Sequence, residues 1–185
     1  MKTRSFSALL VMGMATLAFP LHANSSEEPQ LNFSCQVTEG VPTTVAMNTE
    51  TDAQLPIFHW KKEALETKSN DSPEELCNMV ADKLENYSAQ GYDLSQINFV
   101  GTVVQDELPA ICANAAESGC GKVLLTLSPN KDVAPATVAS DVVGLILDKN
   151  LNPQKTESRE RGVQSISYRV DFWSLLGLTP KFLTK

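Results

Sequence analysis

The sequence predicts an α+β fold in which an antiparallel β-sheet of about six to seven strands carries two helices on one face and is stapled by disulfides. Three observations lead to this prediction. Short apolar or alternating runs of strand length recur along the chain, two longer segments repeat apolar residues with the helical period, and four cysteines are present. The 185 residues suffice for one domain with its own core, and 42% apolar with 20% charged residues is typical of globular proteins.

The N-terminus has the three parts of a secretory signal peptide. Lys2 and Arg4 precede an apolar run over residues 8–19, and the small residue Ala23 follows it. We therefore predict a signal peptide over residues 1–23, cleaved after Ala23. The run is shorter than the roughly 20 apolar residues that span a bilayer, although an uncleaved anchor is the alternative.

The rest of the chain is expected to form a single domain with no transmembrane segment, because no later apolar run is long enough to cross a bilayer. Residues 24–31 are polar and read as a flexible lead, residues 32–176 as the domain, and residues 177–185 as a C-terminal tail. No internal repeat and no second domain boundary is visible.

Three strands are expected before the first helix. Apolar and polar residues alternate over 31–36, which predicts a half-buried strand, and residues 43–47 are rich in β-branched side chains. The third strand, over residues 55–61, contains Pro56. Proline cannot donate to a strand ladder, so this strand is expected at an edge.

The strongest helix signal begins at Ser72. Ser72 and Glu75 have the spacing of a capping box around Pro73, which suits the first helical position. Apolar residues then recur every fourth position as far as Leu84. Gly91 fits the position that follows the helix C-terminus.

The second half of the chain alternates strands with one more helix. Residues 109–127 predict a hairpin, and its apolar run over 123–127 is expected to be covered on both faces, with the rest of the domain packed around it. A polar, mixed-charge stretch over 150–163 reads as a long exposed loop. The expected elements are strands over 97–104, 109–113, 122–128 and 165–172 and an amphipathic helix over 136–149.

All four cysteines follow the signal peptide, and an even count in an exported chain favours two disulfides. We favour Cys35–Cys77, which ties the first helix to the first strand, and Cys112–Cys120, which closes the hairpin at its loop end. A pairing of Cys35 or Cys77 into the hairpin stays open. A zinc site is not expected, since there is no C-x-x-C pair, and no cofactor is predicted.

Net charge excludes two classes of partner. Loss of Lys2 and Arg4 with the signal peptide leaves 15 − 2 = 13 basic residues against 22 acidic ones, a net charge of −9. This balance opposes nucleic-acid binding and electrostatic docking on anionic lipid, which both depend on Lys and Arg. The acidic residues between Asp52 and Glu75 lack the spacing of a calcium loop and read as a solvated face.

His59 is the single histidine left after cleavage of the signal peptide. As a catalytic base it would need a nucleophile on one side and an orienting acid on the other. No G-x-S-x-G pattern is present, so packing or solvent exposure is the expected role of His59. A hydrolase that combines His59 with a Ser and an Asp brought together by folding is the alternative.

Four large aromatic residues occupy or follow predicted strands and could form an exposed partner surface. Core packing is the competing interpretation for at least two of them. They are Phe58, Trp60, Phe172 and Trp173.

The chain contains, in order, the motifs Phe33-Ser34-Cys35, Pro42-Thr43-Thr44-Val45-Ala46, Pro56-Ile57-Phe58-His59-Trp60, Ser72-Pro73-Glu74-Glu75-Leu76-Cys77, Pro109-Ala110-Ile111-Cys112, Gly119-Cys120 and Leu124-Leu125-Thr126-Leu127. Together these motifs resemble the cyanobacterial circadian oscillating polypeptide family. The resemblance covers about residues 32–147, with four matching cysteines. One departure is Leu76, where the family tends to place Arg before the helix cysteine. The resemblance implies an exported cyanobacterial protein and no catalytic mechanism.

These observations together predict an exported, non-enzymatic module, structural or binding, whose working surface is a sheet edge or the aromatic patch. Its partner would be an unknown protein or small ligand. The expected location is the periplasm, a thylakoid lumen or the exterior of the cell.

Overall fold

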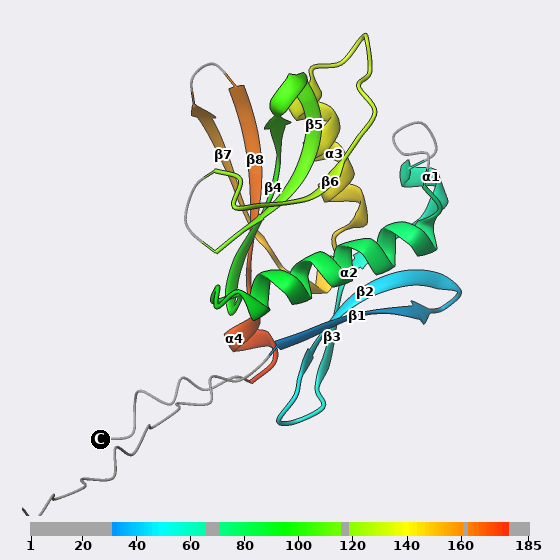
Figure 1. Cartoon of the computed structure of the whole chain (residues 1–185), viewed down its shortest axis with the longest axis vertical. Coiled ribbons are helices and arrows are strands. Elements are labelled where there is room, and N and C mark those ends of the chain that lie inside the picture. Colours follow the sequence, from blue (N-terminus) through cyan, green and yellow to red (C-terminus); the bar gives the residue numbers. More distant parts are fainter. Residues whose placement is uncertain (1–30, 66–70, 116–118, 161–162, 178–185) are drawn as a thin grey trace, which may run out of the picture.

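A computed structural model describes residues 31–65, 71–115, 119–160 and 163–177. The predicted signal peptide, its cleavage site after Ala23, residues 24–30 and residues 178–185 lie outside the described residues. Figure 1 shows the arrangement of the helices and strands.

The described chain contains eight strands, four α-helices and two short 3-10 helices. In order they are β1 (Leu31–Thr38), β2 (Val41–Asn48), β3 (Gln54–His59), α1 (Lys62–Leu65), α2 (Pro73–Ala89), β4 (Gln96–Val104), η1 (Gln105–Glu107), β5 (Leu108–Asn114), β6 (Lys122–Thr126), α3 (Pro135–Ile146), η2 (Lys149–Leu151), β7 (Gln154–Glu160), β8 (Val163–Asp171) and α4 (Phe172–Leu175).

The strands form two antiparallel sheets, so the α+β class is correct and the expectation of one sheet is wrong. β1, β2 and β3 form a three-stranded sheet, and the other five strands form a second sheet in the order β6-β5-β4-β8-β7. β3 does not pair with β4. Pro56 lacks an N–H, and a register shift occurs opposite it at Thr44/Val45, so β3 offers little regular edge for another strand.

Helix α2 begins where the capping box predicts. The Ser72 hydroxyl accepts from the Glu75 N–H at 3.3 Å, and a Glu75 carboxylate oxygen accepts from the Ser72 N–H at 2.8 Å. The Ser72 N–H and the Ser72 hydroxyl, which donates to the same carboxylate oxygen at 2.7 Å, favour the ionised form and lower the pKa of Glu75. The helix ends at Ala89, and Gly91 follows with a φ of 85°, the left-handed conformation that glycine adopts without strain.

The two long helices cover different parts of the molecule rather than one face of one sheet. α2 packs against β1 and β2 and also reaches β6, so it spans both sheets (Figure 1). α3 packs against β4, β5 and β8. Its close approach requires Gly101, because a Cβ there would lie 2.4 Å from the backbone nitrogen of Ser140.

Two other expectations in the second half of the chain are wrong. Residues 154–160 are not loop but the strand β7, which pairs with β8 over its whole length. The apolar strand β6 is not central, because it lies at an edge of the five-stranded sheet and β4 occupies the middle. Leu124 and Leu125 of β6 are nevertheless buried, whereas Thr126 is exposed.

Beside a small cluster of Val100, Ala110 and Cys112, one large hydrophobic core fills the space between the two sheets and the two long helices. It includes residues from every sheet and from α2, α3 and the C-terminal segment, where Leu176 is 5% exposed. Cys35 pairs with Cys77 and Cys112 with Cys120, with Cα–Cα distances of 5.5 and 5.3 Å. The structure therefore contains the two pairings favoured from the sequence, one joining β1 to α2 and one across the β5–β6 hairpin.

Candidate functional site

The predicted aromatic surface does not exist as such, because three of its four residues lie in the core. Phe58 and Phe172 are fully buried, and Trp60 is 1% exposed. Phe58 packs edge-on against Phe99, with ring centroids 4.7 Å apart, and only Trp173 is partly exposed. Alternation along a strand shows which residues share a face, but it does not show which face the other elements cover.

Folding brings His59 next to an acid that is distant in the sequence. Nε2 of His59 lies 2.5 Å from Oδ2 of Asp148, and Nδ1 lies 3.3 Å from Oγ1 of Thr43. Asp148 is held by its own backbone, since its N–H donates to the carbonyl of Ile57 at 2.8 Å. Its other carboxylate oxygen accepts from the N–H of Asn150 at 2.7 Å and so caps η2.

This arrangement has an acid, an imidazole and a hydroxyl in a row, but the hydroxyl is poorly placed for attack on a substrate. Thr43 is completely buried, and its Oγ1 donates to the carbonyl of Val41 at 3.0 Å. The side chain of His59 is 25% exposed and that of Asp148 only 9%. The contacts of His59 therefore join β2 and β3 to the segment that follows α3.

The sulfur atoms and carboxylates do not form a metal site within the described residues. All four cysteines are in disulfides, and no cluster of three or more His, Cys, Asp or Glu side chains with metal-binding geometry occurs in the described part of the chain. Glu75, within the predicted acidic face, serves the α2 cap instead.

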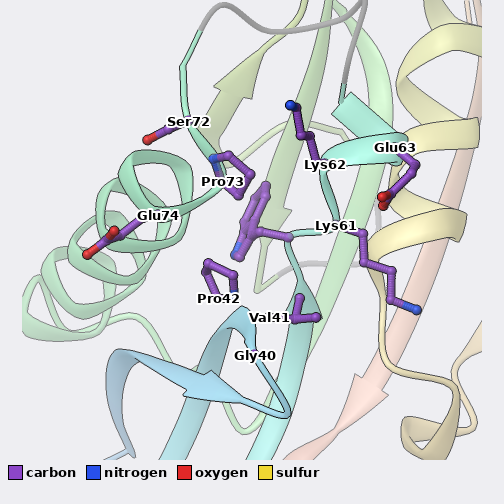
Figure 2. Close-up of a pocket in the computed structure, with 10 residues that line it drawn as sticks. Gly40, Val41, Pro42, Lys61, Lys62, Glu63, Ser72, Pro73 and Glu74 are labelled. Atoms are coloured by element: carbon purple, nitrogen blue, oxygen red, sulfur yellow. The ribbon is translucent and has the colours of Figure 1, made fainter.

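A shallow pocket of about 440 Å³ lies between the β1–β2 turn and the N-terminus of α2. Pro42, Trp60 and Pro73 line it with apolar groups. Figure 2 shows Pro42 at the start of β2 and Pro73 at the start of α2. Two of the polar groups that line the pocket already have partners. Trp60 donates its indole N–H to Thr44 at 2.8 Å, and Ser72 caps the helix.

The four sheet edges differ in how they are covered, and this difference defines the candidate site. At the edge strand β1, the N–H of Phe33 donates to a carboxylate oxygen of Glu85 on α2 at 2.9 Å. At the edge strand β3, Phe58 forms a bridge with Leu147, next to the bond from Asp148 to Ile57. Each edge of the three-stranded sheet is thus bonded, over part of its length, to another segment of the chain.

The edge strand β6 is covered by the opposite side of α2. The ammonium group of Lys83 donates to the carbonyl of Leu124 at 2.7 Å. Burial, and then the charge of Lys122, lower the pKa of Lys83. One helix therefore covers an edge of each sheet, using an acid toward β1 and a base toward β6.

The fourth edge, β7, is open. Within the described residues no strand lies beyond β7, and β8 is the one element with which it makes extensive contact. Residues 154–158 are all exposed. Figure 1 shows β7 at the outer side of the five-stranded sheet, away from α2 and α3.

The register of the sheet shows which backbone groups of β8 face this edge strand. The N–H of Phe172 donates to the carbonyl of Ser95 at 2.8 Å, so this pair belongs to the hydrogen-bonded set of the β4–β8 ladder. Hydrogen-bonded and non-hydrogen-bonded residues alternate along an antiparallel strand. Ser167 lies an odd number of positions from Phe172, so its backbone N–H and carbonyl face β7 instead of β4.

The same alternation assigns the backbone of β7. Thr156 is opposite Ser167, so its amide and carbonyl face β8. The neighbouring residues Lys155, Glu157 and Arg159 consequently direct their amide and carbonyl groups outward. These groups can accept a further antiparallel strand.

Comparison with known proteins places the chain in a family. The sequence profile described as circadian oscillating protein COP23 matches residues 32–176, most of the chain. The chain belongs to this family. No curated protein and no solved structure matches it.

The family match confirms the resemblance read from the motifs, but it assigns no site. Among the described residues, no helix has the length and apolar character needed to cross a membrane. Sequence reasoning missed β7 because all of its residues are polar. The signal that could have revealed it is the charge at every second position, Lys155, Glu157 and Arg159, in a stretch long enough for a strand.

Proposed function

We propose that the chain is an exported, disulfide-stapled binding module that adds an extended segment of a partner to β7. The observation that carries this proposal is that β7 is the one uncovered edge among the described strands, whereas side chains or backbone of the chain itself cover the other three. Strand addition gives affinity through main-chain hydrogen bonds, and alternate side chains give specificity.

Export is part of the proposal and rests on two features. The sequence over residues 1–23 has the pattern of a signal peptide. Every cysteine is paired, and such disulfides persist in oxidising compartments outside the cytosol. N-terminal sequencing of the native protein tests it. Native material that begins at Met1 and carries free thiols would contradict export.

Binding through β7 can be tested with a matched pair of variants. Extended peptides selected from a random library against the wild-type chain should bind with backbone protection at residues 155 and 157, measured by hydrogen exchange. Glu157→Pro removes an outward N–H without removing a bond to β8, so it should abolish this binding. Glu157→Ala removes the same charge but keeps the N–H, so it should retain binding. Peptides that bind Glu157→Pro as tightly as the wild-type chain would contradict the proposal.

We also propose that the module is not an enzyme. The support is the buried hydroxyl of Thr43 beside His59, which a substrate could not reach without unfolding of β2. The test is a survey of ester and peptide substrates with the wild-type chain and with His59→Ala. Turnover by the wild-type chain that disappears in this variant would favour the hydrolase alternative.

A further inference from the structure

On the basis of the proposed binding at β7, we propose that the partner of this edge is a second copy of the chain. The β7 strands of the two copies would pair in an antiparallel register centred on Thr156. The two five-stranded sheets would then join into one continuous sheet. The pairing is isologous, because each copy offers the same strand to the other.

Lys155 and Glu157 direct their amides and carbonyls away from β8, as the ladder register requires. In the register centred on Thr156, Lys155 of each copy stands opposite Glu157 of the other. These are hydrogen-bonded pairs, so each such pair exchanges two main-chain bonds across the interface.

Charge then selects this register. The side chains of Lys155 and Glu157 are exposed, at 51% and 58%, and their charged groups lie 3.5 Å apart within one chain. In the proposed register the two-fold axis creates two Lys–Glu pairs between copies, and opposite charges directly across an antiparallel ladder stabilise it. Each side chain can turn from its neighbour to the other copy with little loss, since the exposed pair within one chain contributes little.

Neighbouring registers are disfavoured by the same rule. A shift that centres the pairing on Glu157 would place Glu157 opposite Glu157 and Lys155 opposite Arg159, and both pairs carry like charges. Centring on Lys155 would place Lys155 opposite itself. A register centred on Ser158 would place Glu157 opposite Arg159 and is the competing complementary arrangement.

Charged edge strands usually prevent association, because a random register brings like charges together. In β7 the sign alternates along the outward residues, from Lys155 to Glu157 to Arg159. This pattern rejects most partners and most registers while accepting its own antiparallel copy in a defined one.

The test is sedimentation equilibrium of the chain from residue 24, over micromolar to millimolar concentrations, with charge-exchange variants. The wild-type chain should form dimers. Lys155→Glu and Glu157→Lys should each weaken dimerisation roughly tenfold, because two attractive pairs become repulsive. The double variant with both changes should restore wild-type dimerisation. Glu157→Pro should be monomeric, since it removes an outward donor at both symmetric positions.

The outcomes separate this inference from the proposed function. A wild-type chain that stays monomeric overturns self-pairing. If selected peptides still bind β7 in a Pro-sensitive way, the proposed function stands. A dimer that is insensitive to Glu157→Pro overturns the inference by showing a different interface. In the register centred on Ser158, Glu157→Lys would weaken the dimer, Lys155→Glu would leave it unaffected, and the double variant would not restore it. This set of results would overturn the register centred on Thr156.

Discussion

The two edges of the five-stranded sheet, β6 and β7, are managed in opposite ways. β6 is apolar, with Leu124 and Leu125 buried, and α2 lies against it with Lys83 bonded to its backbone. β7 is polar along the whole of its described surface and has no such cover in the described chain.

In this sheet the apolar edge strand is covered by a helix, and the polar edge strand is left open. An apolar edge strand left open is a template for aggregation, so the chain assigns a helix to it. A polar edge can remain open without that hazard and stays available to a chosen partner. Four predictions test whether α2 protects the β6 edge and whether the outward groups of β7 are free to pair with a partner.

The largest effect is expected from the disulfide that attaches the covering helix. Replacing both Cys35 and Cys77 by Ser should lower the free energy of unfolding by about 4 kcal/mol, because 42 residues separate the two cysteines. Replacing both Cys112 and Cys120 should cost about 2.5 kcal/mol for the shorter loop. Urea denaturation of the two double variants measures both values. Equal losses of unfolding free energy in the two double variants would show that the disulfide to α2 stabilises the fold no more than the hairpin disulfide does.

The second prediction compares the two sides of β7 itself. Thr156→Pro removes a donor that faces β8, so it should destabilise the fold by about 2–3 kcal/mol. Glu157→Pro removes an outward donor and should cost below about 1 kcal/mol, since proline is tolerated at an edge. Thermal unfolding at a concentration that keeps the chain monomeric gives the comparison. The reverse order would mean that the outward assignment of Glu157 is wrong.

The third prediction removes the two polar contacts between α2 and the covered edges. Lys83→Met and Glu85→Met keep most of the aliphatic stem but lose the bonds to Leu124 and Phe33, at about 1 kcal/mol each. Lys83→Met should also increase aggregation on heating, measured by light scattering, because a carbonyl of β6 becomes available. Unchanged scattering would indicate that packing of α2 alone protects this edge.

The smallest effect is expected for charges on the open edge. Lys155→Glu should change the stability of the monomer by less than about 0.5 kcal/mol, because the ion pair with Glu157 is exposed. Chemical denaturation at low protein concentration measures this value. A cost above about 1 kcal/mol would mean that the charge of Lys155 supports the fold of the single chain.

Local patterns predicted a large part of the structure. The capping box at Ser72, the glycine after α2 and seven of the eight strands follow from spacings within a few residues. The pairing of Cys112 with Cys120 follows from the hairpin that contains them. Such features depend on neighbours in the chain, so a sequence carries them directly.

By itself, then, the sequence determined the class of the fold, the helix that begins at Ser72 and the family of the chain. Tertiary structure alone decided that the strands divide into two sheets, that Phe58 and Trp60 face inward, and that Asp148 meets His59 from 89 residues away. It also decided which edge stays open. The physical reason is that burial and edge cover depend on packing between distant segments, which the period of a strand or a helix does not encode.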